Sequence, residues 1–164
     1  AHNGQLKDFI DSFPVKLHLP VGSTDSEHAF CWILDQLHYQ FGDQQPGACE
    51  LFTFIAGLSE RINQYGVFNV IITDGESLFA FCSNNLHWIT RRAPFGKASL
   101  IDAEMLVDFK EETSDKDIVT VIATQPLTED ETWHKMSPGQ WQLFCLGESI
   151  ACGQMQFDET CAAK

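Results

Sequence analysis

The fold of this chain is indicated most clearly by the sequence Val67-Phe68-Asn69-Val70-Ile71-Ile72-Thr73-Asp74-Gly75-Glu76-Ser77-Leu78-Phe79-Ala80-Phe81-Cys82. Two largely apolar runs, residues 67–73 and 76–82, flank an Asp-Gly pair. Asp-Gly between such runs is a strong hairpin signal, because the tightest hairpin turns need positive φ angles that these residues tolerate. The stretch therefore predicts two adjacent antiparallel strands in the middle of the chain.

On the N-terminal side of this hairpin the apolar spacing is helical. Thr24-Asp25-Ser26-Glu27 matches the capping box, in which Thr24 accepts from a first-turn amide and Glu27 reaches back. Apolar residues then recur every three or four positions, which predicts a helix over residues 25–41. Gly42-Asp43 and Pro46-Gly47 interrupt the pattern, and a second helix is predicted over residues 49–64.

On the C-terminal side the pattern is extended. Strands are predicted at residues 87–91, 97–101, 105–109, 117–124 and 141–146. The run 118–123 is β-branched and nearly all apolar, which is typical of a strand covered on both faces. Residues 127–136 are polar and acidic and read as a loop or a helical turn. Two helices followed by successive antiparallel strands indicate an α+β layered fold.

The composition describes an acidic chain that should fold. It has 164 residues, about the size of one domain, and its 44% hydrophobic and 12% aromatic content excludes a disordered acidic segment. The formal net charge of -13 argues against nucleic acid and against anionic membrane surfaces, because both attract clustered Lys and Arg. No apolar stretch approaches the roughly 18 residues of a transmembrane helix.

Six cysteines are spread along the chain, at positions 31, 49, 82, 145, 152 and 161. Cys31, Cys82 and Cys145 lie inside apolar runs, where we expect buried free thiols. The sequence has no C-x-x-C and no zinc-spaced pair of histidines, which predicts no structural metal. The start shows no signal peptide, so the predicted compartment is the cytoplasm, although a truncated start could hide a targeting segment.

Two groups near the start could carry chemistry. By itself, the pair Asn3-Gly4 is most often a turn, but a side-chain amide beside an unencumbered backbone N–H can also form an oxyanion hole. Asp25, in the first turn of the predicted helix, favourably meets the helix dipole, and its alternative role is to hold a substrate ammonium group. The motifs of common hydrolases and nucleotide-binding proteins, G-x-S-x-G, the P-loop and G-x-G-x-x-G, do not occur.

Two further pairs invite a functional interpretation. His87 and Trp88 fall in a predicted strand, where packing or a satisfied hydrogen bond is the favoured role over catalysis. Arg91 and Arg92 could bind a carboxylate, but in so acidic a chain ion pairs with the chain's own acids are favoured.

Several separated motifs together resemble a known family. In chain order they are Ala1-His2-Asn3-Gly4-Gln5-Leu6, Thr24-Asp25-Ser26-Glu27-His28-Ala29-Phe30, Gly66-Val67-Phe68-Asn69, Ser77-Leu78-Phe79-Ala80, Arg91-Arg92-Ala93-Pro94-Phe95-Gly96, Val121-Ile122-Ala123-Thr124-Gln125-Pro126-Leu127-Thr128, Glu131-Thr132-Trp133 and Gly139-Gln140-Trp141. The set resembles the class II glutamine amidotransferase domain, one of the N-terminal-nucleophile hydrolases, and within it the bacterial YafJ-type branch. The resemblance extends to about residue 148.

The resemblance implies a fold and a reaction. It implies a four-layer α-β-β-α sandwich with mainly antiparallel sheets, of which residues 1–150 would be the C-terminal portion and residues 151–164 a flexible tail. It also implies hydrolysis of the glutamine amide through a cysteine thioester, which releases ammonia. Asn3 and Gly4 would form the oxyanion hole, and Asp25 would take the substrate's α-ammonium group. No metal or organic cofactor is implied.

The chain departs from the family at the nucleophile. The family uses an N-terminal cysteine, whereas residue 1 is Ala and none of the six cysteines stands at its position. We therefore expect that a missing N-terminal half of the same domain carries the nucleophile and the arginine for the substrate carboxylate. On this interpretation the chain alone is inactive and exposes apolar strand edges and faces.

The expected partners are glutamine or a γ-glutamyl small molecule and the missing half, with no nucleic acid and no membrane. The ammonia acceptor is not identified by the sequence, and it would be a separate protein or absent. Two alternatives stay open: hydrolysis of a γ-glutamyl peptide or conjugate by the same fold, and a non-catalytic interaction domain.

Overall fold

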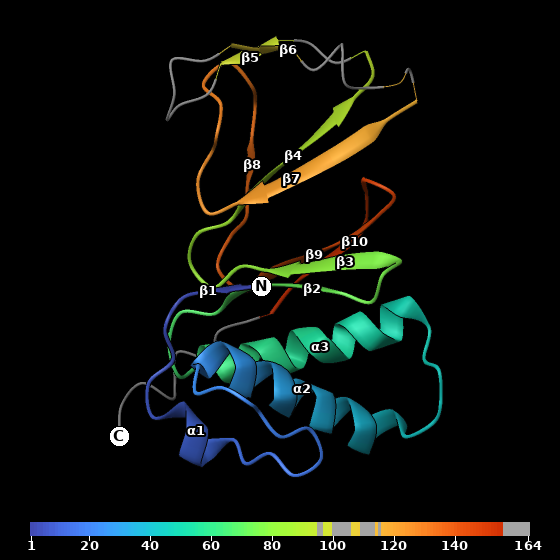
Figure 1. The fold of residues 1–164 in the computed structure, drawn as a ribbon. Helices are drawn as coiled ribbons and strands as arrows, with labels where there is room; N and C mark the ends of the chain where they lie inside the picture. The colour runs from blue at the N-terminus through green and yellow to red at the C-terminus, as the bar shows by residue number, and fades with distance from the viewer. Residues whose placement is uncertain (95–96, 100–105, 109–113, 115, 156–164) are drawn as a thin grey trace.

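The computed structural model describes residues 1–94, 97–99, 106–108, 114 and 116–155, and it is layered. Two long helices lie on one side of a five-stranded sheet, and a three-stranded sheet lies on the other side (Figure 1). The helices are α1 (Phe9–Ser12), α2 (Asp25–Phe41) and α3 (Ala48–Asn63). The strands are β1 (His2–Asn3), β2 (Asn69–Thr73), β3 (Ser77–Phe81), β4 (His87–Arg92), β5 (Lys97–Ser99), β6 (Leu106–Asp108), β7 (Ile118–Ala123), β8 (His134–Lys135), β9 (Gln140–Cys145) and β10 (Glu148–Gln154).

The predicted hairpin is confirmed as β2 and β3. These strands pair antiparallel from Val70 opposite Phe81 to Thr73 opposite Leu78. Asp74 caps the turn, because its carboxylate oxygen Oδ1 accepts from the backbone N–H groups of Glu76 at 3.0 Å and Ser77 at 2.7 Å. The hairpin forms the centre of the larger sheet, whose strand order is β1-β2-β3-β9-β10.

The main hydrophobic core lies between this sheet and the two long helices. Its largest fully buried side chains include Phe52 of α3 and Phe79 of β3, whose rings stack with their centroids 5.8 Å apart. Phe68, just before β2, is also fully buried. Burial of each such aromatic side chain contributes on the order of 2–3 kcal/mol, so packing of this layer dominates the stability of the fold.

The predicted helices are confirmed, with bounds within one residue of those expected. The capping box is only half as predicted. Thr24 accepts from the Glu27 N–H at 3.2 Å, but the Glu27 carboxylate does not reach back to Thr24. Its two oxygens instead accept from the N–H groups of Val21 and Gly22, each at 2.8 Å. The loop before α2 folds back close to the start of the helix, so the Val21 and Gly22 amides reach the Glu27 carboxylate in place of the Thr24 amide.

The smaller sheet has the order β7-β4-β8. It is linked to the larger sheet by Trp88 of β4, whose ring lies 5.4 Å from that of Phe144 in β9. The prediction that residues 118–123 are covered on both faces is wrong for this chain. β7 is the outer strand of its sheet, its residues are only partly buried, and Val119 is 41% exposed. The expected loop at residues 127–136 contains the short strand β8.

The predictions for the short strands, for the C-terminal tail and for the cysteines are confirmed only in part. β5 and β6 pair within the strands predicted at residues 97–101 and 105–109, whose remaining positions lie outside the described residues. Residues 151–154, expected in the tail, pair with β9 as part of β10, and residues 156–164 lie outside the described part. Cys31 and Cys82 are buried as predicted, whereas Cys145 is only partly buried.

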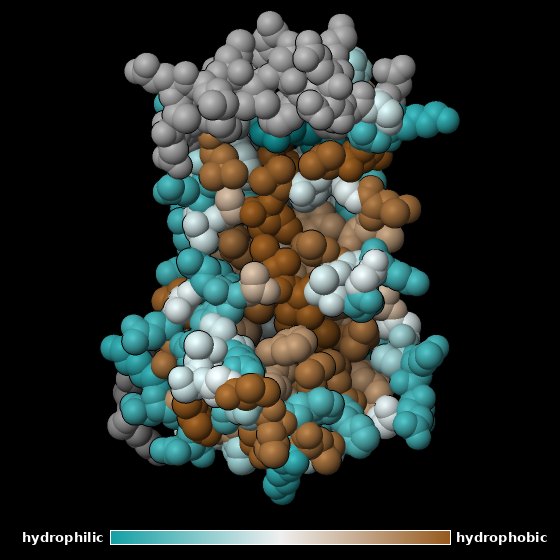
Figure 2. Space-filling view, viewed as in Figure 1, coloured by the Kyte–Doolittle hydropathy of each residue, from teal (hydrophilic) through white to brown (hydrophobic). Residues whose placement is uncertain are grey.

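The α+β class with antiparallel sheets is confirmed, and three of the expected layers, α-β-β, are formed by described residues. Figure 2 shows apolar side chains running down one face, from the three-stranded sheet to the helical layer. Exposed large apolar residues include Phe30, Val119 and Leu146. In the described part of the chain, no helix is long and apolar enough to cross a membrane.

Candidate functional site

The first residues of the chain form the outer strand of the large sheet. Ala1 and Ile71 exchange two backbone hydrogen bonds of 2.8 Å, and His2 and Asn3 lie opposite Val70 and Asn69. Among the described interactions, none uses the side chain of Asn3, which is exposed. The strand therefore presents the Asn3 amide at the surface while its backbone is held by β2.

Gly4 follows directly and is glycine for a steric reason. Its φ is +151°, and a Cβ atom added to it would lie 1.8 Å from the carbonyl oxygen of Val67. The chain continues in close contact with the start of β2, because the Val67 N–H donates to the Gln5 carbonyl at 3.2 Å. Only glycine fits this approach, so the peptide after Asn3 has one defined orientation.

Asp25 begins helix α2 and is tied to the same segment. Its Oδ2 accepts from the Leu6 N–H at 2.8 Å, and its Oδ1 accepts from the Ser26 N–H at 2.7 Å. The Asp25 carboxylate therefore contacts the backbone two residues after Gly4, and these two hydrogen bonds orient it. A carboxylate has about four lone-pair sites, so capacity remains for an additional cationic donor.

His2 joins these two elements. Its Nδ1 lies 2.8 Å from the hydroxyl oxygen of Ser26, and its Nε2 lies 3.0 Å from the carbonyl oxygen of Val67. The ring also packs on Phe68, with centroids 4.8 Å apart. The structure thus brings Asn3, Gly4 and Asp25 together through His2, Ser26 and Leu6. His2 and Ser26 were not predicted as site residues, although they adjoin Asn3 and Asp25 in the sequence.

A cavity of about 460 Å³ lies between β2 and the start of α2. His2 and Ser26 line it, together with Phe30 of α2 and the strand residues Ile71 and Ile72. Asn3, Gly4 and Asp25 are not among its lining residues. The cavity is therefore a neighbour of the Asn3-Gly4 and Asp25 groups, and the His2–Ser26 contact forms part of its wall.

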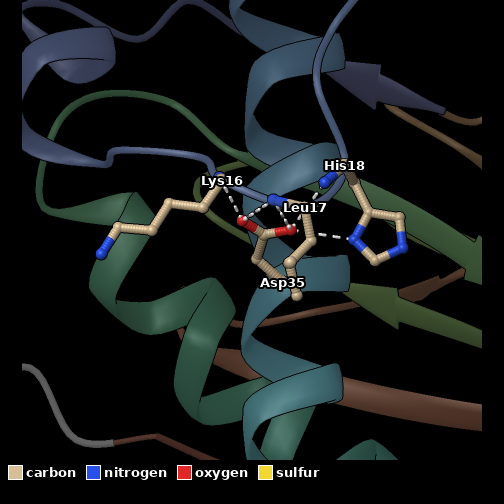
Figure 3. A network of polar contacts seen from close by, with 4 residues as sticks. All are labelled: Lys16, Leu17, His18 and Asp35. Carbon is tan, nitrogen blue, oxygen red and sulfur yellow. Dashed lines mark hydrogen bonds and ion pairs between the residues drawn. The ribbon is translucent and has the colours of Figure 1, made fainter.

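The loop before α2 is positioned by a buried carboxylate, Asp35 (Figure 3). Asp35 is fully buried and accepts from the backbone N–H groups of Lys16 at 2.6 Å, Leu17 at 3.1 Å and His18 at 2.9 Å, and it lies 2.8 Å from His18 Nδ1. Burial would raise the pKa of Asp35, but these hydrogen bonds outweigh it and hold the pKa well below its usual range. No motif in the sequence indicates this network.

The two innermost cysteines have the wrong environment for a nucleophile. Burial raises the pKa of the Cys31 thiol, and the nearby carboxylates of Glu27 and Asp35 raise it further. Burial also raises the pKa of the Cys82 thiol. A reactive cysteine needs the opposite shift, because the thiolate is the attacking species.

The remaining candidates have structural partners. Arg91 forms an ion pair with Glu131, and Arg92 with Glu148, so the predicted internal pairing is confirmed. The Arg91 hydrogen bond is the main cause that lowers the pKa of Glu131. His87 Nδ1 lies 3.3 Å from the carbonyl oxygen of Thr124, just beyond the paired strand β7, and Trp88 packs against Phe144 of the larger sheet, in line with their expected structural roles.

Comparisons with known proteins show which family this chain resembles. The family model of class II glutamine amidotransferases matches residues 1–164. YafJ of Escherichia coli K12, named as a candidate glutamine amidotransferase, is 51% identical over 150 residues, which are 92% of this chain and 58% of YafJ. A protein of Haemophilus influenzae with the same kind of name is 43% identical, over 92% of this chain and 51% of its own length.

A solved structure is also similar. The crystal structure of a predicted glutamine amidotransferase from Pseudomonas aeruginosa PA01 matches with a TM-score of 0.79 and 46% identity, over 92% of this chain and 58% of the solved one. The chain thus spans about half the length of the curated relatives that it matches. The family resemblance and the expected type of fold are confirmed. The chain belongs to the class II glutamine amidotransferase family.

Proposed function

We propose that this chain is the C-terminal portion of a domain that hydrolyses the side-chain amide of glutamine and releases ammonia. The observation that carries the proposal is the exposed Asn3-Gly4 pair, held in one orientation at the end of β1 and tied through Leu6 to Asp25. Family membership and the likeness to named amidotransferases support it.

In the proposed reaction, Asn3 and Gly4 act on the oxygen of the attacked amide. A cysteine thiol that precedes this segment in the full-length protein adds to the γ-carbonyl carbon, and the carbonyl oxygen becomes an oxyanion. The Asn3 side-chain N–H and the Gly4 backbone N–H donate to that oxyanion. Such a donor is worth about 3 kcal/mol of transition-state stabilisation. The intermediate collapses as the nitrogen takes a proton and leaves as ammonia, and water then hydrolyses the thioester to glutamate and free thiol.

Asp25 has a binding role in this proposal. Its carboxylate, already oriented by the Leu6 and Ser26 amides, accepts a charge-assisted hydrogen bond from the substrate's α-ammonium group. This contact selects a free glutamine or a terminal γ-glutamyl group over a simple amide. The reaction uses no metal and no organic cofactor. The proposed compartment is the cytoplasm, and we name no ammonia acceptor.

The test is an assay of ammonia release by the full-length protein with glutamine and with γ-glutamyl peptides, and by residues 1–164 alone. We expect release by the full-length protein, with mass spectrometry showing an N-terminal cysteine, and none by residues 1–164. Cleavage of γ-glutamyl peptides with no release from glutamine would replace the amidotransferase by a peptide hydrolase. Inactivity toward both substrates would indicate a non-catalytic domain and overturn the proposal.

A further inference from the structure

Asn69 is a buried polar residue at the start of β2. It is only 2% exposed, and its side-chain oxygen Oδ1 accepts from three consecutive backbone N–H groups, those of Ser83, Asn84 and Asn85, at 2.9, 3.2 and 3.4 Å. Three converging donors identify which end of the amide is the oxygen. The nitrogen, Nδ2, therefore faces the other way.

That nitrogen reaches the carbonyl of Asn3. Nδ2 donates to the Asn3 carbonyl oxygen at 3.3 Å and to Asn84 Oδ1 at 2.8 Å. Asn3 is also the cross-strand partner of Asn69. Ala1 and Ile71 form a hydrogen-bonded pair, so the alternation of an antiparallel ladder makes Asn3 and Asn69 the next such pair. The Asn3 carbonyl is thus directed at β2 and receives the side-chain donor there.

The Asn3 carbonyl and the Gly4 N–H belong to one planar peptide. In a trans peptide these two groups point in opposite directions, so holding the carbonyl toward β2 directs the Gly4 N–H away from β2. A donor on the carbonyl also polarises the peptide and strengthens its N–H as a donor. The effect of Asn69 is therefore exerted on the N–H group that the proposed reaction uses.

We infer that Asn69 is a positioning residue of the oxyanion hole, which orients and polarises the Asn3–Gly4 peptide from the buried side of the sheet. This inference rests on the proposed function. We assign Asn69 no contact with substrate, because it is buried at the start of β2, beside β1 in the sheet. Its other role, capping the amides of residues 83–85, is structural, and a test has to separate the two.

The substitution N69D separates them. It keeps an oxygen for the three amides of residues 83–85 but removes the N–H donor to the Asn3 carbonyl. Three backbone N–H groups keep the new carboxyl ionised, as they do for Asp35, so it cannot donate to that carbonyl. N69S shortens the side chain and loses both contacts. S83A removes the 2.5 Å hydrogen bond from Ser83 Oγ to Asn63 and disturbs the same loop while leaving Asn69 intact.

The experiment measures kcat and KM for glutamine with the full-length protein and these three variants at neutral pH. We expect N69D to lose roughly tenfold in kcat with KM within about twofold, because misoriented catalytic groups cost mainly turnover. N69S should lose kcat to at least the same extent, and S83A should retain its kcat.

Each other outcome contradicts the inference. Equal losses of kcat in N69D and S83A, or an N69D loss that appears in KM alone, would reduce Asn69 to a loop cap. Failure of both N69D and N69S to fold, checked by circular dichroism, would assign it to folding alone. If the unsubstituted protein releases no ammonia, the proposed function fails first and the role of Asn69 falls with it, an outcome distinct from the others.

Discussion

The Nδ1 atom of His2 lies 2.8 Å from the hydroxyl oxygen of Ser26, so a side-chain contact joins β1 to the first turn of α2. His2 Nε2 faces the Val67 carbonyl, which can only accept, and therefore carries a hydrogen. In the neutral ring Nδ1 then accepts from the Ser26 hydroxyl, whose oxygen also lies 3.3 Å from Asp25 Oδ1. Since Asn3 follows His2 and Asp25 precedes Ser26, this contact helps set the spacing of the two proposed substrate-binding groups.

The His2–Ser26 contact should appear as a coupling energy. In a double-mutant cycle with H2A and S26A, we expect the free energies of unfolding in urea to deviate from additivity by about 1 kcal/mol, the usual worth of one hydrogen bond. The control cycle pairs H2A with S59A, whose hydroxyl bonds within α3 to the Ile55 carbonyl. The control should be additive, and additivity in both cycles would show that the contact contributes no coupling.

Gly4 and Gly57 should respond oppositely to the same added methyl group. G4A places a Cβ 1.8 Å from the Val67 oxygen at a positive φ, so we expect a loss of at least about 1 kcal/mol in unfolding free energy. Gly57 lies in α3 with open space around its Cβ position, and G57A should stabilise by about 0.5–1 kcal/mol. Thermal unfolding measures both. If G4A left the free energy of unfolding unchanged, β1 would not be held against the start of β2.

The acid stability of the fold should depend on Asp35. Its carboxyl has a lowered pKa in the folded state, so its contribution is present above the unfolded pKa of about 3.9 and is lost as the pH falls through the folded value. D35N puts an amide nitrogen against the N–H groups of residues 16–18, and should cost roughly 2 kcal/mol at pH 7.

The comparison is between Tm values at neutral pH and at about pH 3. The gap between the unsubstituted chain and D35N should narrow at acid pH, because the carboxylate's advantage diminishes there. D11N, at an exposed position of α1, is the matched control and should shift stability by no more than about 0.5 kcal/mol at either pH. A gap that is independent of pH would contradict the role of the Asp35 carboxylate.

The hairpin and the two long helices could be predicted from the sequence. The Asp-Gly pair and the helical spacing after Thr24 located the hairpin and both long helices, because turn geometry and amphipathic periodicity are properties of neighbouring residues. The partly exposed face of β7 could not be predicted in this way, because a strand's cover depends on segments distant in sequence. The Asp35 network and the Glu27 cap depend on how the loop of residues 13–22 folds back onto α2, and the spacing of residues in the sequence does not predict that path.

The same division applies to the candidate site. Asn3, Gly4 and Asp25 were found from residue type, position and family resemblance. His2 of β1 and Ser26 of α2 are 24 residues apart in the sequence, and only the packing of these two elements brings them into contact. Asn69 left one usable signal, an amide at the start of a largely apolar strand, but its partners at Asn3 and in the 83–85 loop required the fold.

The most direct test of the central claim is the turnover of the N3A variant of the full-length protein with glutamine as substrate. The Asn3 side chain makes no hydrogen bond among the described interactions, so its removal should leave Tm within about 2 °C. Loss of an oxyanion donor should lower kcat on the order of 100-fold. A folded N3A protein with unchanged kcat would contradict the assignment of Asn3 to the oxyanion hole.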